Sequence, residues 1–345
     1  MWRRRSNTWR GPAPERGMNS PRIPAVVAAA LLLFGCGNDP AGPIELRFGH
    51  VGAPGSLYAV SAEEFARRAN ERLEDRATVI VFGSSQLGND EVLLQKLKLG
   101  TIDFALPSSI MSSTIPEFGL FEMPYLVKDR DHMRRIEEEI FWPRLRPLVI
   151  ERGYDIIVVW ENGFRHVTNS IRPIVTPDDL AGIKLRTPRG IWRVKMFQAF
   201  GANPAPMALS EVFVALQTGV MDGQENPLAQ IVSSKFQEVQ PYLSLTRHVY
   251  SPAYVAVGVN RWNRLPEDVR RILEETAREM QSFVYETAQR MDIDLLQELR
   301  EANVAVNEPL IESFAATSQA VYEEFAQAVP AGRELLDHAV RLAGD

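Results

Sequence analysis

The sequence predicts an α/β protein of two domains, each a mostly parallel sheet flanked by helices, with a ligand cleft between the domains and one long helix spanning both. Three observations support this prediction. Strand and helix patterns alternate from Ile44 onward, the chain crosses between two such units twice, and an unusually long helical pattern follows the second crossing. The length of 345 residues and the apolar content of 45% suffice for two hydrophobic cores.

The first 35 residues have the pattern of an export signal. Arginines precede an unbroken apolar run at 25–34, which is too short to span a bilayer and is typical of the apolar core of a signal peptide. The sequence Leu-Phe-Gly-Cys at 33–36 resembles a bacterial lipobox, although Phe34 is untypical there. We therefore expect a signal peptide over 1–35 and a lipidated Cys36. The alternative is an ordinary signal peptide cut slightly downstream.

Met18 is an alternative start of the protein, because Arg22 and the apolar run follow it.

Charge and cysteine content narrow the classes of function that the protein can have. Cys36 is the only cysteine, so an internal disulfide is excluded and stability must come from packing. Six of the 38 basic and one of the 44 acidic residues precede Cys36, which leaves a net charge of −11 on the remainder. This charge argues against nucleic-acid binding, and any anion site must depend on a few local arginines.

The first unit follows a polar tether at 36–43. Asn89 and Asp90 stand where a helix cap is expected, and Gly100 ends the same helix. Polar residues at the carboxyl ends of strands mark the edge where parallel sheets bind ligands, here Ser84, Asn89, Asp90 and Ser108. The predicted elements are strands at 44–48, 78–82 and 102–106 and helices at about 57–73 and 90–99.

The chain then crosses to a second unit and returns. A buried strand at 155–160 leads into an extended crossing at 162–167, and Ser251-Pro252 is expected to break the second unit before a returning strand at 253–259. Two crossings imply a hinge. Pro266 opens a helical pattern of roughly 50 Å that we expect to pack on both domains. The predicted domains are 44–163 plus 252–290 and 164–251 plus 291–345.

Arg186 is the main candidate for ligand binding. It follows the strand 183–185 and precedes Thr187-Pro188, so its guanidinium should project at the end of a strand. The planar fork of donors suits a carboxylate, which it can bind through two parallel hydrogen bonds. Spacing alone supports a structural ion pair equally well.

Other residues near Arg186 are expected to shape the site. We expect 222–226 to form a turn in which Asn226 offers a donor and an acceptor. Asp222 and Glu225 would hold this turn, since they would repel an anion. The turn follows a helix at 211–217 with Ser210 as its cap and Gly219 as its end, a rigid extended loop is expected at 201–207, and Trp192 and Phe197 are expected to pack in the core.

The order and spacing of motifs from Lys184 to Asn226 closely resemble the signature of the substrate-binding proteins of TRAP (tripartite ATP-independent periplasmic) transporters, dicarboxylate type. The resemblance extends over nearly the whole chain after Cys36, from Phe48 through the segment 84–88 to the long helix. It implies a periplasmic-binding-protein fold, an organic acid ligand (a C4-dicarboxylate, a 2-oxo acid or a sugar acid) and a sodium-driven membrane permease as partner.

The resemblance also assigns residues. The family places its carboxylate-binding arginine in a Lys-x-Arg motif, which Arg186 matches, and a family asparagine near that arginine matches Asn226. Arg165 matches a second arginine of the sialic-acid branch, in an Asn-Gly-x-Arg motif, with a salt bridge at the hinge as the alternative. Arg189 stands where that branch has an amide, so it suggests a second acidic group on the ligand, a different sugar acid, or mere exposure to solvent.

Three further positions match pocket residues of the family. Leu209 corresponds to a position that often lines the ligand, and it could equally belong to the core. Asp90 and Ser108 match first-domain pocket positions of the sialic-acid branch; a helix cap and a strand-end turn are their alternatives.

Motifs for other chemistry are missing from the sequence. The five histidines form no close ligand pair, and glycine patterns for nucleotides or a nucleophilic serine do not occur, so we predict no metal, no cofactor and no catalysis. We expect a monomeric carrier. Two alternatives stay open: a periplasmic enzyme with Asp90 or Glu225 as base, and an envelope scaffold lipoprotein without a small ligand.

Overall fold

The computed structural model describes Gly11 and residues 42–344. Apart from Gly11, the predicted signal peptide lies outside these residues, as do Cys36 with its predicted lipidation and most of the tether. Within 42–344, no helix combines the length and apolar character needed to cross a membrane.

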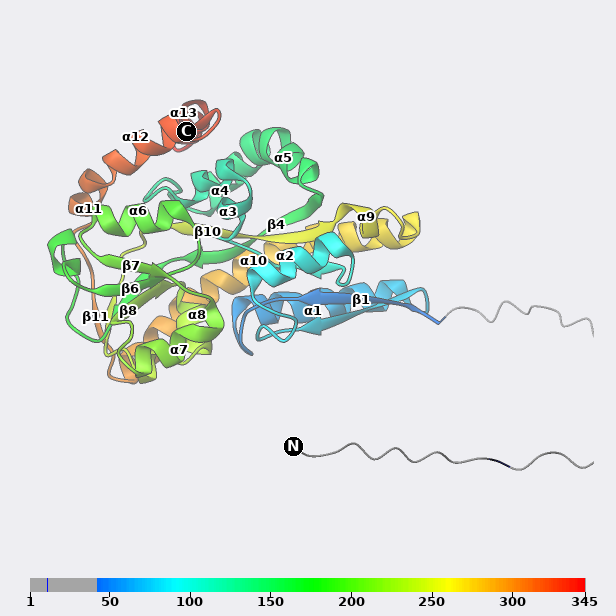
Figure 1. Ribbon diagram of the computed structural model, residues 1–345, viewed down its shortest axis with the longest axis horizontal. Helices are drawn as coiled ribbons and strands as arrows, with labels where there is room; N and C mark the ends of the chain where they lie inside the picture. The colour runs from blue at the N-terminus through cyan, green and yellow to red at the C-terminus, as the bar shows by residue number, and fades with distance from the viewer. Residues whose placement is uncertain (1–10, 12–41, 345) are drawn as a thin grey trace, which may run out of the picture. The chain divides into compact units, whose positions relative to one another are not determined.

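Residues 42–344 form two sheets, the first of which has five strands in the order β2-β1-β3-β10-β4. Strand β1 pairs in parallel with β2 and β3, whereas β10 is antiparallel to β3 and β4. Strands β4 and β10 thus bring the chain out to the second sheet and back (Figure 1). The strands are β1 (Ile44–Gly49), β2 (Ala77–Phe82), β3 (Phe104–Ala105), β4 (Tyr154–Phe164) and β10 (Tyr250–Gly258).

The second sheet has six strands in the order β11-β9-β5-β8-β6-β7. Its β6 pairs in parallel with β7 and β8, while β5 runs antiparallel to β8 and β9. The predicted α/β class is confirmed, with two mixed sheets flanked by helices. The strands are β5 (His166–Asn169), β6 (Lys184–Thr187), β7 (Asn203–Pro206), β8 (Gly223–Asn226), β9 (Tyr242–Ser244) and β11 (Ala305–Asn307).

We call residues 44–164 and 250–263, around the first sheet, the first lobe, and residues 166–244 the second lobe. The first lobe contains α1 (Leu57–Leu73), α2 (Asp90–Leu99), α3 (Met111–Thr114), η1 (Pro116–Glu122), α4 (Arg130–Ile136), η2 (Glu137–Leu145), α5 (Arg146–Glu151) and α9 (Val259–Trp262). The second contains η3 (Pro177–Leu180), α6 (Ile191–Ala199), α7 (Leu209–Gln217), α8 (Leu228–Ser233) and η4 (Phe236–Glu238).

Helix α2, which lines the candidate site, begins and ends as predicted. The Asn89 side chain accepts a hydrogen bond from the Val92 amide at 3.0 Å, which satisfies one free N–H of the first turn. Gly100 adopts a left-handed conformation (φ 72°) at the other end. The cap therefore fixes where Asp90 stands.

The predicted long helix is α10 (Glu267–Glu301), which has 35 residues and follows Pro266. It packs against α1 and β4 of the first lobe and against α8 of the second (Figure 1). Buried apolar side chains along one stripe, among them Leu273, Met280 and Val284, make this packing possible. The remaining helices are α11 (Ile311–Thr317), α12 (Gln319–Ala328) and α13 (Gly332–Leu342). The exact domain boundaries stay a prediction.

The largest hydrophobic cluster surrounds the first sheet, and two smaller ones lie against the second. Trp192 and Phe197 are both buried on α6 and pack as predicted. Trp192 belongs to the cluster of the first lobe, where its ring lies 5.2 Å from that of Phe325. A Cβ at Gly119 would lie 2.4 Å from the Trp192 ring, so the backbone of η1 approaches α6 closely.

Two predicted interruptions are strands instead. Ser251-Pro252 lies within β10, where the register shifts between these two residues. A bulge accommodates the proline, which cannot donate to the ladder, without ending the strand. The segment predicted as a loop at 201–207 contains β7, which tolerates Pro204 and Pro206 because it lies at the edge of its sheet.

Two predictions next to the site were also wrong. The segment 222–226 was expected to form a turn, but it contains β8, which lies between β5 and β6. Ser210 does not cap α7. The helix begins at Leu209, and the Glu211 carboxylate accepts a hydrogen bond from the Ala208 amide at 3.2 Å.

Candidate functional site

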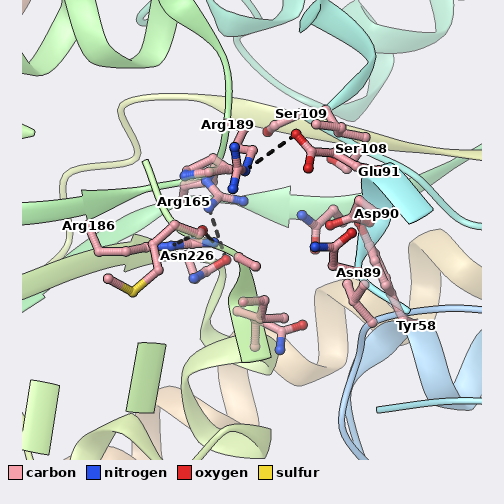
Figure 2. Close-up of a pocket in the computed structure, with 18 residues that line it drawn as sticks. Tyr58, Asn89, Asp90, Glu91, Ser108, Ser109, Arg165, Arg186, Arg189 and Asn226 are labelled. Atoms are coloured by element: carbon pink, nitrogen blue, oxygen red, sulfur yellow. Dashed lines mark hydrogen bonds and ion pairs between the residues drawn. The ribbon is translucent and has the colours of Figure 1, made fainter. Parts of the chain in front are cut away.

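A pocket of about 610 Å³, partly open to solvent, is lined by residues of both lobes (Figure 2). The structure brings all the residues predicted to bind ligand to this pocket: Arg186, Arg165, Asn226, Arg189, Asp90, Ser108 and Leu209. Asn89, predicted to lie at the ligand-binding edge of the first sheet, also lines the pocket, whereas Ser84 of the same prediction does not belong to its lining. Polar lining residues that the sequence did not point to are Tyr58, Glu91, Ser109, Asn162 and Gln230.

Arg186 is a buried cation on β6 with 3% of its surface exposed. Its Nε and one terminal nitrogen donate hydrogen bonds to the Met207 carbonyl at 2.9 and 2.6 Å. No carboxylate of residues 42–344 forms an ion pair with it. Burial lowers the pKa of Arg186 to about 9, against the opposing effect of Glu225. The guanidinium is therefore still charged at neutral pH, in a place where water cannot fully solvate it.

Arg165, between β4 and β5, is already paired. Its Nε and one terminal nitrogen donate to the two carboxylate oxygens of Glu225 at 2.5 and 2.9 Å. The same terminal nitrogen donates to Asn226 Oδ1 at 2.9 Å, and Asn226 Nδ2 donates to Gln224 Oε1 at 2.6 Å. Arg165 thus makes the structural salt bridge that was the alternative to ligand binding. Its side chain also lines the pocket.

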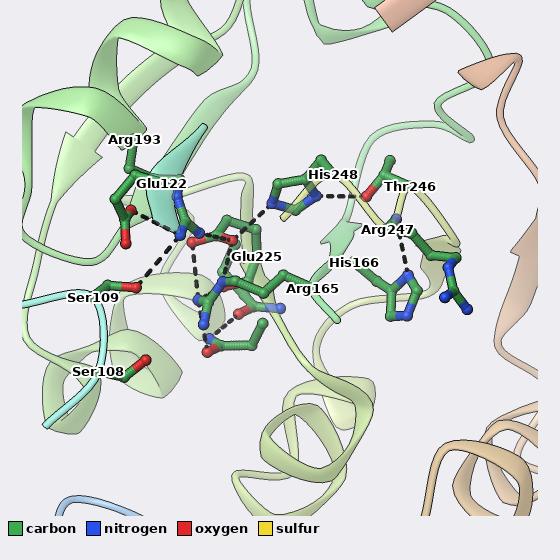
Figure 3. Close-up of polar contacts among 12 residues, drawn as sticks. Ser108, Ser109, Glu122, Arg165, His166, Arg193, Glu225, Thr246, Arg247 and His248 are labelled. Carbon is green, nitrogen blue, oxygen red and sulfur yellow. Dashed lines mark hydrogen bonds and ion pairs between the residues drawn. The ribbon is translucent and has the colours of Figure 1, made fainter. Parts of the chain in front are cut away.

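Glu225 joins a buried network behind the pocket (Figure 3). Arg193 of α6 lies 2.6 Å from Glu225 Oε2 and 2.8 Å from Glu122 Oε2, so it joins acids of the two lobes. His248 Nε2 lies 2.9 Å from Glu225 Oε2 and carries the proton there, because burial lowers the pKa of His248 to about 4 and a carboxylate can only accept.

The arginines determine the charge of Glu225. Burial alone would favour its neutral form, but Arg165 and Arg193 outweigh this effect and hold the pKa of Glu225 well below its usual range. Two features of the sequence point to this network. Arg193 follows Trp192 on the buried face of a helix, and Glu122 interrupts an apolar run.

Arg189 and Asp90 differ in how they are paired. Arg189 is half exposed, and its Nε lies 3.4 Å from Glu91 Oε1, so this ion pair spans the pocket between the lobes (Figure 2). Asp90, the first residue of α2, is partly buried and makes no ion pair with any described residue. Burial raises the pKa of Asp90 to about 6, although Arg186 acts in the opposite direction.

Ser108 and Leu209 have structural contacts besides their place in the lining. The Ser108 hydroxyl donates to the Pro252 carbonyl at 2.6 Å, as expected for a strand-end turn. Leu209 packs against two hydrophobic clusters. Over 42–344, no group of three or more His, Cys, Asp or Glu residues has a geometry that could hold a metal ion.

The sequence matches a family model described as bacterial extracellular solute-binding protein, family 7 (DctP), over residues 48–328. This chain belongs to that family. A similar relative is the 2,3-diketo-L-gulonate-binding periplasmic protein YiaO of Escherichia coli, 33% identical over 239 residues, which are 69% of this chain and 73% of the relative.

Solved structures of similar proteins agree with the family 7 assignment. The sugar acid binding protein DctPAm of Advenella mimigardefordensis, in complex with galactonate, has a TM-score of 0.84 and 32% identity, covering 88% of this chain and 98% of that one. A TRAP periplasmic solute binding protein of Polaromonas sp. JS666, bound to D-erythronate, has a TM-score of 0.82 and 32% identity, covering 86% of this chain and 98% of that one.

The Glu225 network predicts a large loss of stability when its carboxylate is removed. Glu225→Gln leaves Arg165 and Arg193 buried without their shared charge, so we expect a loss of about 3 to 5 kcal/mol in the free energy of unfolding, measured by urea denaturation. Glu238→Gln, which removes an exposed acid beside Lys235, is the matched control and should change stability by less than about 0.5 kcal/mol. Equal losses in both variants would contradict the structural role of Glu225.

Asp90 predicts a stability that depends on pH. Its folded pKa of about 6 exceeds the ordinary value of 3.8, so its stabilising effect is present below pH 4 and is lost as the pH rises through 6. Asp90→Asn should therefore raise the free energy of unfolding at pH 8 by about 1 to 2 kcal/mol, the shift of roughly two units less the benefit of an acid at a helix N-terminus. Below about pH 3, where the carboxyl is protonated in both the folded and the unfolded state, the difference should vanish. Asp294→Asn, an exposed change on α10, is the control, and a pH-independent difference for Asp90→Asn would refute the prediction.

Proposed function

We propose that this protein captures an organic acid anion in the pocket between its lobes and delivers it to the sodium-coupled permease of a TRAP transporter. The observation that carries the proposal is Arg186. A buried guanidinium that pairs with no acid in the described part of the chain is complementary to a carboxylate supplied by a ligand. The acids bound by the similar proteins, galactonate and D-erythronate among them, support the same class of ligand.

The donors of Arg186 suit this role. The guanidinium has five N–H donors, and its two hydrogen bonds to Met207 use only two of them. The remaining donors can bind two carboxylate oxygens in parallel, which a lysine at this place could not do. Arg165, at the crossing between the lobes, and Asn226 of the second lobe complete the contact, while Asp90 and Ser108 line the same pocket from the first lobe.

A ligand in contact with both lobes also explains how delivery would be regulated. The ligand stabilises the closed arrangement only to the extent that it binds that form better than an open one. Contacts to the first lobe and to Arg186 at once provide this difference, because opening would remove one set. The closed surface would then be recognised by the membrane subunits.

We propose binding without catalysis. Glu225, considered as a base, has both carboxylate oxygens bonded and a pKa well below its usual range, which makes it a weak base. Asp90 is the other carboxylate that could serve as the catalytic base of an enzyme, so turnover of the ligand has to be tested directly. After long incubation with the protein, we expect mass spectrometry to find the ligand chemically unchanged. Turnover of the ligand would favour an enzyme.

Arg186 provides the central test. Arg186→Ala should abolish the thermal stabilisation that an organic acid gives to the wild type, measured by differential scanning fluorimetry, because the carboxylate loses its buried partner. Arg186→Lys should weaken it strongly, since the charge is kept and the fork is lost. Arg271→Ala, an exposed change on α10, is the control and should keep the full shift. A full shift in Arg186→Ala would remove the proposed role of this residue.

We also propose that the protein is exported and acts in the periplasm as a monomer, held at the membrane by a lipidated Cys36. The basic segment, the apolar run and the Leu-Phe-Gly-Cys sequence at 33–36 support this. Intact-mass analysis of the mature protein should show an N-terminal Cys36 with acyl groups, and Cys36→Ser should release the protein from the membrane fraction. An unmodified N-terminus downstream of Cys36 would contradict lipidation and leave export intact.

A further inference from the structure

The charges that line the pocket restrict which organic acid it can hold, and this argument rests on the proposed function. Three arginines line the pocket, but two are engaged by the protein. Arg165 is bonded to Glu225 through two nitrogens, and Arg189 is paired with Glu91. Among residues 42–344, Arg186 is therefore the one lining guanidinium without an acid partner. The pocket therefore offers a ligand one unpaired guanidinium, Arg186, which is enough for one carboxylate.

Arg189 is the position at which a second acidic group on the ligand was considered from the sequence. In the structure, its charge is directed to Glu91 at 3.4 Å, with about half of each side chain exposed. A second carboxylate would have to displace Glu91 from Arg189 and would leave Glu91 as an unpaired like charge beside it. The pair thus disfavours a dicarboxylate even though it contains an arginine.

The lobe opposite Arg186 presents an acceptor. Asp90 and Arg186 lie on opposite sides of the pocket (Figure 2), and no side-chain donor of the described residues bonds the Asp90 carboxylate. A hydroxyl donor would satisfy it through a charge-assisted hydrogen bond, whereas a second carboxylate would face Asp90 as a like charge. The raised pKa of Asp90 agrees with a carboxylate that lacks such donors in the ligand-free protein.

We propose that the ligand is a polyhydroxylated monocarboxylate: its single carboxylate binds Arg186, its distal hydroxyls donate to Asp90, and the Glu91–Arg189 pair selects against a second carboxylate. Aldonic acids have this chemistry. Dicarboxylates such as succinate and aldaric acids are the class that the site excludes.

Matched ligand pairs test this. Isothermal titration calorimetry at pH 7.5 would compare D-gluconate with D-glucarate and D-erythronate with meso-tartrate, in which the second acid differs by oxidation of the terminal CH₂OH to a carboxylate. We expect each pair that binds to favour the aldonate by at least about tenfold in Kd. Galactonate and succinate complete the panel, with succinate expected to bind more weakly than any bound aldonate.

Two variants assign the selectivity to residues. Glu91→Gln releases Arg189 and should reduce the aldonate preference at least threefold by improving aldarate binding. Asp90→Asn should weaken the aldonate and strengthen the aldarate, because it removes both the charged acceptor and the repulsion. Glu63→Gln, which removes an exposed charge from α1, is the control and should leave the preference unchanged.

The outcomes separate the two proposals. An aldarate or succinate that binds the wild type as tightly as the aldonates overturns the inference and leaves the capture of organic acids standing. An aldonate preference that persists undiminished in both Glu91→Gln and Asp90→Asn overturns the role of these residues. If no acid of the panel binds folded wild type, the proposed function fails and the inference fails with it.

Discussion

One buried carboxylate, Glu225, determines the charge balance on which the site depends. It accepts hydrogen bonds from Arg165 and Arg193 and contacts His248, all within the core. Without this shared anion, Arg165 would be buried with no acid partner and Arg193 would keep only Glu122, so the desolvation of the two guanidinium groups would be poorly compensated. Since Glu225 is engaged in this way, it does not neutralise Arg186 directly. Among residues 42–344, Arg186 is therefore left as the pocket-lining arginine without an acid partner, and the carboxylate of a ligand could pair with its charge.

Without a ligand, the charged groups of the site lower the stability of the folded protein. Arg186 and Asp90 both have pKa values shifted toward their neutral forms by burial, which means that each charged form is less stable in the folded protein than in water. Such conflicts are common at functional sites, and the rest of the fold must offset them. Here the large core around the first sheet and the packing of α10 supply the stability. A ligand that meets both charges would relieve the conflict, so binding and stabilisation have the same physical origin.

Local signals in the sequence predicted much of this structure, and interactions between distant residues explain what it missed. The caps of α2 at Asn89 and Gly100 and the apolar stripe of α10 depend on neighbouring residues, and both were predicted correctly. Strand β8 has no comparable local pattern: the polar sequence Gly-Gln-Glu-Asn becomes a strand because β5 and β6 lie on either side of it. The same limit applies to the pairing of Arg189 with Glu91, which are 98 positions apart. The family resemblance implied which side chains reach the pocket, but not which of them were already paired.

The pairing decides how similar arginines come to differ in role. Arg193 holds acids of both lobes, Arg165 is held by Glu225 at the edge of the pocket, and Arg186 contacts a backbone carbonyl. A carbonyl orients a guanidinium without cancelling its charge, so Arg186 is fixed in position and still attracts an anion. A carboxylate in place of that carbonyl would have made the same side chain a structural ion pair. The Met207 carbonyl thus orients Arg186, and because it is a backbone group, no substitution of the Met207 side chain would remove this contact.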